Sequence, residues 1–555
     1  MKHKYSAVAN TLKLLRLDKR DILNIYFYAI AAGLISLGLP LGIQAIIGFV
    51  MAAQLSTSLI LLIGVVVLAT LIYGIFQINQ LKITEKIKQK IFVRFALAFD
   101  EKMSSLDLQQ TKDKKLMEHM NRYFDIIGFQ KSLSKLLIDI PSSTMQILLG
   151  LMLLAFYHPL FIIFGLFLLA TLYFLIRLTG IQGLKSSYDE STHKYALAHW
   201  FETQAEFVKD VRLGTLSNVA SKKSQHIVGD YLQARNEHFK VLKIQYWSLL
   251  LFKVVLTAAM LSVGSYLLIE QLINIGQFVA AEIVIILLLS AIEKMIFGLD
   301  NVYDLLTSTK KILNVTDMPE VPEHQRIDLQ HNHVFNLIAE DISIDSKNVQ
   351  VLPIINCSLK QGDRVAIIGA SGSGKSSLLN VLSGLYINYN GRLILDELVV
   401  PKEGNNFLQK NTSALFKESG LIPGTLIDNI ILERDGISGR DIIQLSKAIG
   451  FHTSFMMLPE GYNTPMVRTE YNVPAEIKKM TLLLRTFCAD KAVFIVEEPF
   501  SDLQEENIAS LKKYLQESIS NKILIYSTLM KDHLDISNQN ILLKKNQAFQ
   551  NSNDQ

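Results

Sequence analysis

The sequence predicts two fold classes in one chain, an all-α membrane domain of six helices followed by an α/β domain with a mainly parallel sheet. Six long apolar runs precede residue 310. After residue 326, short apolar runs alternate with helical patterns, which is typical of a parallel sheet covered by helices. Between these parts, Pro319 and Pro322 interrupt either kind of regular structure. The two parts therefore form separate domains.

The six apolar runs are each long enough, at 1.5 Å per residue, to cross a hydrocarbon core of about 30 Å. We place the spans at roughly Ile22–Met51, Ser56–Ile78, Leu133–Tyr157, Pro159–Ile176, Trp247–Ile269 and Phe278–Phe297. The residues before Asp21 are polar and basic and carry no cleavable signal pattern. We therefore expect the first run to remain as a membrane anchor.

Long polar connections, from about Asn79 to Lys131 and from Arg177 to Gln245, alternate with very short ones. Both are rich in lysine and arginine, as is the N-terminus, and positive charge marks the cytoplasmic side of a span. We expect a multi-pass protein of the cytoplasmic (inner) membrane, in contact with membrane lipid. Both termini and the C-terminal domain are then in the cytoplasm.

Four charged residues fall within or near the last two spans, where a charge is costly unless it faces a partner or a cavity. They are Lys253, Glu282, Glu293 and Lys294. One interpretation is a role in a translocation path. For Glu293 and Lys294 the other is that their side chains extend from the end of the span to the interface.

The net charge and the number of cysteines exclude several classes of protein. The formal net charge is only +4, so no nucleic-acid partner is indicated. The two cysteines, Cys357 and Cys488, are far apart in the sequence, which excludes a disulfide framework and fits a reducing cytoplasm. The predicted organisation is a membrane domain at 1–310, a linker at 311–325, an α/β domain at 326–545 and a polar tail at 546–555.

One stretch fits the phosphate-loop pattern G-x-x-x-x-G-K-S/T in full, running from Gly369 to Ser377. An apolar strand-like run precedes it and a helical pattern follows. In that setting the glycines let backbone N–H groups turn toward a phosphate chain, and the helix adds its positive N-terminal end. The sequence therefore predicts a P-loop nucleotide-binding domain. Its candidate ATP-binding residues are Gly369, Ser371, Gly372, Ser373, Gly374, Lys375, Ser376 and Ser377.

Two carboxylates, Glu497 and Glu498, end the buried strand predicted at Ala492–Val496. The carboxyl end of such a strand is where metal and water chemistry is placed in α/β folds. Further strands are predicted at Arg364–Ile368, Arg392–Leu395, Ser413–Phe416 and Lys522–Tyr526.

Together these features resemble the ATP-binding cassette (ABC) exporters, as a half-transporter with fused membrane and nucleotide domains, over roughly residues 20 to 545. Beyond the phosphate loop, the resemblance is carried by Gly424-Thr425, Leu458 to Thr464 and Glu498-Pro499. Asn121 to Asp125 resembles the peptide and protein secretion branch, for which a periplasmic adaptor protein is an open partner. A second half-transporter chain is implied because each ATP site needs two chains, and it can be identical or different.

The resemblance assigns roles to site residues. It implies ATP and magnesium as cofactors, with Lys375 on the β- and γ-phosphates and magnesium held by Ser376 and Glu497. Glu498 stands at the position of the catalytic general base. A short coupling helix that docks on the nucleotide domain is implied within each long connection, at about Asp107–Lys115 and Val211–Asn218.

Several positions depart from the family pattern. The signature segment that closes the partner's ATP site aligns with Val473 to Ile477, where Pro474 lacks an N–H and Glu476 adds negative charge. The family's glutamine becomes Lys417, a loop aspartate becomes Gln504, and the histidine becomes Leu529, with His533 four residues later. One interpretation is an exporter subunit that couples ATP binding, and hydrolysis if competent, to substrate export. The alternative is a non-hydrolysing regulatory or structural subunit of a heteromeric transporter.

Overall fold

The computed structural model describes residues 2–52, 57–111, 116–214, 217–321, 336–346, 349–396, 398–402, 406–434, 436–466 and 473–544. The chain divides into two compact units, Met1–Ser104 with Lys114–Met318 and Ser105–Asp113 with Pro319–Gln555. The predicted tail at 546–555 and residues 322–325 of the predicted linker lie outside the described residues. Each unit is described by itself.

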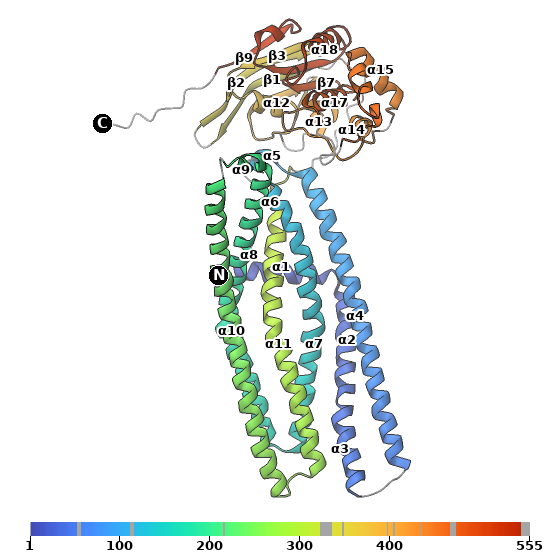
Figure 1. Ribbon diagram of the computed structural model, residues 1–555, viewed down its shortest axis with the longest axis vertical. Helices are drawn as coiled ribbons and strands as arrows, with labels where there is room; N and C mark the ends of the chain where they lie inside the picture. Colours follow the sequence, from blue (N-terminus) through green and yellow to red (C-terminus); the bar gives the residue numbers. More distant parts are fainter. Residues whose placement is uncertain are drawn as a thin grey trace, which may run out of the picture. The chain divides into compact units, whose positions relative to one another are not determined.

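The first unit is entirely helical in its described part (Figure 1). Its helices are α1 (Lys2–Arg16), α2 (Lys19–Ser36), α3 (Gly38–Met51), α4 (Thr57–Ser105), α6 (Leu116–Met120), the 3₁₀ turn η1 (Asn121–Phe124), α7 (Asp125–Tyr157), α8 (Leu160–Glu206), α9 (Val208–Arg212), α10 (Ser217–Ile269) and α11 (Ile275–Thr316). Six of these segments are long and apolar enough to cross a membrane. The predicted six-helix membrane domain is therefore confirmed.

The helices are longer than the predicted spans because their polar ends continue the same helix beyond the apolar window. The first span consists of two helices, α2 and α3, which meet at Leu37. Gly38 and Pro40 follow directly, and both weaken an α-helix. Helix α7 packs on α11 and on α2, and α8 packs on α10. Helix α1 lies across the long helices (Figure 1), and its Thr11 hydroxyl hydrogen-bonds that of Thr309 in α11 at 3.0 Å.

Two of the charged residues in the last spans form an ion pair. Lys253 Nζ of α10 lies 2.6 Å from Glu293 Oε2 of α11. An ion pair lowers the cost of both charges inside an apolar domain. Glu293 is thus paired with a residue of a neighbouring helix, and its extension to the membrane interface stays a prediction.

The second unit contains two sheets. The first has the order β6-β7-β8-β3-β9, and all neighbouring strands are parallel. Its strands are β3 (Arg364–Gly369), β6 (Thr412–Leu415), β7 (Val493–Glu497), β8 (Ile523–Thr528) and β9 (Gln539–Leu543). The second sheet is antiparallel, in the order β2-β1-β4-β5. Its strands are β1 (Asn336–Ser346), β2 (Val349–Lys360), β4 (Asn390–Leu395) and β5 (Leu398–Val399).

The predicted parallel sheet is confirmed, with one correction. The strand predicted at Arg392–Leu395 belongs to the antiparallel sheet, where it pairs with β1. Strand β1 itself gives a weak sequence signal. Its register shifts between Ala339 and Ile342, and Asp341 has a positive φ of 51°, so its apolar residues do not alternate regularly.

The parallel sheet separates two hydrophobic cores because successive side chains of a strand point to opposite faces. In β8, Ile523 and Ile525 join one core, and Leu524 and Tyr526 join the other. Helix α12 (Lys375–Leu382) belongs to the first core, while α17 (Ala475–Phe487) and α18 (Glu505–Glu517) belong to the second. The remaining helices and turns of this unit are α5 (Leu108–Thr111), α13 (Asn406–Asn411), α14 (Leu426–Ile431), α15 (Gly439–Ile449), α16 (His452–Met456), η2 (Gly461–Asn463) and η3 (Lys531–His533).

Residues 105–111 pack within this second unit. Gln109 Nε2 in α5 donates to the Asn388 carbonyl oxygen at 2.7 Å, and the Asn388 N–H donates to Gln109 Oε1 at 3.0 Å. This reciprocal pair agrees with the docking that the family resemblance implied for Asp107–Lys115. Residues 112–115 of that segment lie outside the described residues.

Helix α10 provides a test of the membrane topology because its two ends must lie on opposite sides if it spans. Its 53 residues extend about 80 Å at 1.5 Å per residue. We expect a membrane-impermeant thiol reagent, added to intact cells, to label Glu270→Cys but not Lys222→Cys. Permeabilised cells should allow labelling of both. The unmodified chain gives the background from its own two cysteines, and labelling of both variants in intact cells would contradict the topology.

Candidate nucleotide-binding site

The phosphate loop connects the end of β3 to the start of α12, as the strand-loop-helix pattern predicts. Gly374 caps α12 with a left-handed φ of 96°. A Cβ at this position would lie 2.7 Å from the Val351 carbonyl oxygen. Only glycine fits both constraints. The loop is therefore set by local backbone geometry.

Lys375 is the first residue of α12, and its side chain folds back over the loop. Its Nζ donates to the carbonyl oxygens of Gly369 at 2.7 Å and Ala370 at 3.0 Å. Both acceptors are uncharged. A bound phosphate group would offer the ammonium a charged acceptor in their place, and such hydrogen bonds are stronger.

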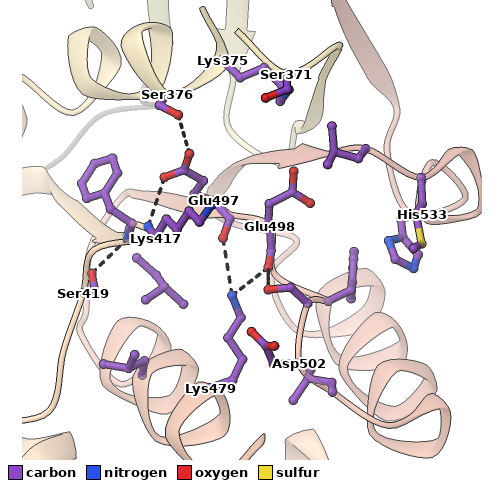
Figure 2. Close-up of a pocket in the computed structure, with 18 of the residues that line it drawn as sticks. Ser371, Lys375, Ser376, Lys417, Ser419, Lys479, Glu497, Glu498, Asp502 and His533 are labelled. Carbon is purple, nitrogen blue, oxygen red and sulfur yellow. Dashed lines mark hydrogen bonds between the residues drawn. The ribbon is translucent and has the colours of Figure 1, made fainter. Parts of the chain in front are cut away.

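Ser376 joins the loop to the end of β7. Its hydroxyl donates to Glu497 Oε1 at 2.5 Å, and the Lys417 backbone N–H donates to the other carboxylate oxygen at 3.1 Å (Figure 2). Glu497 is buried, with 8 % of its surface exposed. A hydroxyl and a carboxylate oxygen are the kind of donors that Mg²⁺ prefers, and their position beside the loop fits a nucleotide-bound metal.

Glu498 follows directly and is held in a left-handed conformation, with a φ of 48°. Its N–H donates to Ser527 Oγ at 3.2 Å. Burial raises the pKa of the Glu498 carboxyl above its usual value, and the nearby charge of Lys375 opposes this. Figure 2 shows the carboxylate of Glu498 directed away from that of Glu497.

Lys479 of α17 is a site residue that the sequence reasoning missed. Its Nζ donates to the Glu498 carbonyl oxygen at 2.7 Å, with the Glu497 carbonyl oxygen at 3.5 Å (Figure 2). Burial lowers the pKa of Lys479 to about 8, while the carboxylates of Asp502, Glu498 and Glu497 oppose the shift. A lysine one helical turn into α17 is an ordinary surface residue by pattern, so only the three-dimensional contact identifies it.

These residues line one cavity of about 1000 Å³. Of the predicted ATP-binding residues, it contains Ser371, Gly372, Gly374, Lys375, Ser376 and Ser377. Gly369 and Ser373 are not part of the lining, and Ser373 is buried in the loop. Glu497 and Glu498 also line it, so the structure brings the predicted metal and catalytic residues to the loop.

Leu529 stands where the family resemblance implies a histidine. This residue is 62 % exposed. His533 does line the same cavity. Its ring packs on that of Phe500, with 4.4 Å between centroids, and its Nδ1 lies 3.4 Å from Thr528 Oγ1. Burial lowers the pKa of His533 below its usual value, with the charge of Lys512 acting in the same direction. The ring is thus held by its packing on Phe500. Figure 2 shows His533 at the side of the cavity away from Lys417.

A family comparison identifies the domain that carries this site. Residues 352–501, which include the loop and both carboxylates, match the family model described as ABC transporter. The C-terminal unit of this chain is an ABC transporter nucleotide-binding domain.

Curated relatives of the ABC domain are of moderate identity. The α-hemolysin translocation ATP-binding protein HlyB of Escherichia coli O6:H1 (strain CFT073) is 26 % identical over 247 residues, 44 % of this chain and 35 % of that protein. A probable ABC transporter ATP-binding/permease protein of Haemophilus influenzae is 26 % identical over 227 residues, 40 % of this chain and 41 % of that protein. The chain thus matches less than half of the length of these curated relatives.

A solved structure extends the fold similarity to nearly the whole chain. A bacterial Atm1-family ABC exporter with ATP bound matches with a TM-score of 0.83, covering 95 % of this chain and 94 % of that one. The sequence identity is 13 %, so this match establishes the fold alone. The six-span membrane domain fused to an ABC domain is therefore an ABC exporter fold.

The signature segment of the ABC domain leads into helix α17. Helix α17 begins at Ala475 after Pro474. The Glu476 carboxylate was expected to add negative charge to the face that meets a partner's ATP. Its Oε1 accepts from the Gln504 N–H and from Asn507 Nδ2, both at 2.8 Å, and these neutral donors do not remove the charge. Glu476 thus caps the start of α18, where a negative charge is favoured by the helix dipole.

This cap gives a direct prediction. We expect Glu476→Ala to speed amide exchange at Gln504 about tenfold, because a hydrogen bond to a charged group contributes roughly 1.5–3 kcal/mol. Hydrogen–deuterium exchange of peptides covering residues 503–511 measures the change. Glu505→Ala removes an exposed carboxylate from the same first turn and serves as the control. Equal exchange in wild type and both variants would show that Glu476 does not cap α18.

Proposed function

We propose that this chain is an exporter-type ABC half-transporter that couples ATP binding to substrate movement across the cytoplasmic membrane, together with a second half-transporter chain. The observation that carries the proposal is the Ser376–Glu497 contact, which joins an intact phosphate loop to a strand-end carboxylate in one cavity. The six span-capable helices of the same chain support the transport part. A periplasmic adaptor, as in protein secretion, is an open further partner.

The chain's own residues have distinct roles in this proposal. Lys375 and the loop amides bind the phosphates, and Glu498 is the catalytic residue that orients the attacking water. Ser376 and Glu497 hold Mg²⁺ where it accompanies the nucleotide, and the metal would stabilise charge on the β- and γ-phosphates. Both termini and the ABC domain are on the cytoplasmic side, by the charge of the long connections.

Hydrolysis by this chain is proposed to be very slow. The position that would contact the γ-phosphate holds the apolar Leu529, and the signature face offers Pro474, which has no N–H. One charge-stabilising group is typically worth roughly 10² in rate, and here several are missing together. In a homodimer both ATP sites would carry the same defects. A different partner chain with an intact signature would repair only the face opposite Lys375.

Nucleotide affinity of the full chain in lipid nanodiscs tests the proposal. We expect wild type to bind ATP and Lys375→Ala to bind it at least about tenfold more weakly, because a charge-assisted contact to phosphate is lost. Equilibrium binding of radiolabelled ATP is the measurement. Lys360→Ala, which removes an exposed lysine outside the cavity, is the control. Equal affinity in wild type and Lys375→Ala would contradict the proposal.

A further inference from the structure

Lys417 has an unusual place beside the candidate metal site. Its backbone N–H holds one oxygen of Glu497, and the other oxygen holds Ser376. The three residues therefore form one continuous contact from the turn that follows β6 to the start of α12. The side chain of Lys417 lines the same cavity as the phosphate loop. Figure 2 shows it extended along the cavity, with its amino nitrogen directed toward the segment that carries Glu497 and Glu498.

The other lysines of the loop region differ from Lys417 in their contacts. Lys375 and Lys479 both donate to backbone carbonyl oxygens, as described above. The ammonium of Lys417 has no ion pair with a carboxylate among the described residues, and the side chain is exposed. Its charge is therefore available to an anion that enters the cavity.

The charged residues that line the cavity affect how strongly a bound polyphosphate depends on a cation. Four lysines (375, 417, 478 and 479) and three carboxylates (497, 498 and 502) line it. A polyphosphate placed at the loop approaches Glu497 and Glu498, and like charges at close range repel. Normally a bound Mg²⁺ is the largest positive charge that offsets this repulsion. The Lys417 ammonium supplies positive charge to the same cavity without a metal ion.

From this arrangement we infer that Lys417 acts as a built-in cation for the nucleotide, so that the pocket binds ATP nearly as well without Mg²⁺ as with it. The inference rests on the proposed function, because it assumes that the pocket binds a nucleoside triphosphate. Lysine suits this role because its ammonium is a compact point charge on a flexible stem, which can follow a phosphate oxygen. A divalent ion at Ser376 and Glu497 would share the cavity with this ammonium, and the repulsion between the two cations lowers the gain from the metal.

ATP affinity of the full chain in lipid nanodiscs, measured by titration calorimetry in excess Mg²⁺ and in excess EDTA, tests the inference. We expect the two affinities of wild type to agree within about threefold. Lys417→Gln should bind ATP about tenfold more weakly in EDTA and regain much of the loss when Mg²⁺ is added, because a charged contact to phosphate is worth about that factor. Lys417→Arg, which keeps the charge, should retain EDTA binding within a few-fold of wild type.

Lys478→Gln provides a matched control. It removes a positive charge from an exposed lysine of the same cavity, and it should leave the ratio of the two affinities unchanged. A wild-type ratio above about tenfold, or a Lys417→Gln ratio equal to that of wild type, would overturn the inference while leaving ATP binding intact. Failure of wild type to bind ATP in either condition would overturn the proposed function as well.

Discussion

The hydrogen bond between Ser376 and Glu497 is the contact on which the rest of the site depends. The two residues are 121 positions apart in the sequence. Ser376 lies in α12, which follows β3, and Glu497 ends β7, and these two strands are separated in the sheet by β8. The contact is possible because parallel strands end at the same edge, where α12 begins. It places a strand-end carboxylate against the first turn of the phosphate-loop helix. Glu498, the candidate general base, follows Glu497 directly, so its position depends on the same strand end.

Four lysines and three carboxylates line the cavity that holds this contact. Lys375 and Lys479 satisfy carbonyl oxygens of the loop and of β7, while Lys417 enters the cavity without a carboxylate partner among the described residues. The family resemblance implies that groups which stabilise charge on a transferred phosphoryl are replaced at Leu529 and Pro474. A site that attracts phosphate but lacks these groups is suited to holding a nucleotide.

The sequence predicts much of this architecture because its strongest signals are local. Six apolar runs and one complete phosphate-loop pattern suffice for both domains, and the strand ending at Glu497 follows from a continuous buried run. The antiparallel sheet is not predicted from the sequence because a positive φ at Asp341 disrupts the alternation of apolar residues in β1. The contacts of Glu476 and Lys479 are not predicted for another reason. Their partners, the start of α18 and the carbonyl of Glu498, are distant in sequence, so an alignment shows the residue type and not its contact.

The fate of bound nucleotide tests the central claim, that this site holds ATP without efficient hydrolysis, most directly. The full chain in lipid nanodiscs would be loaded with ATP labelled on the γ-phosphate, freed of excess nucleotide, and sampled over time for bound ATP and released phosphate. The account predicts that the retained nucleotide stays ATP over hours, and that Glu498→Gln changes this little. Release of most of the labelled phosphate within minutes, abolished by Glu498→Gln, would contradict it and identify an ordinary active ATPase.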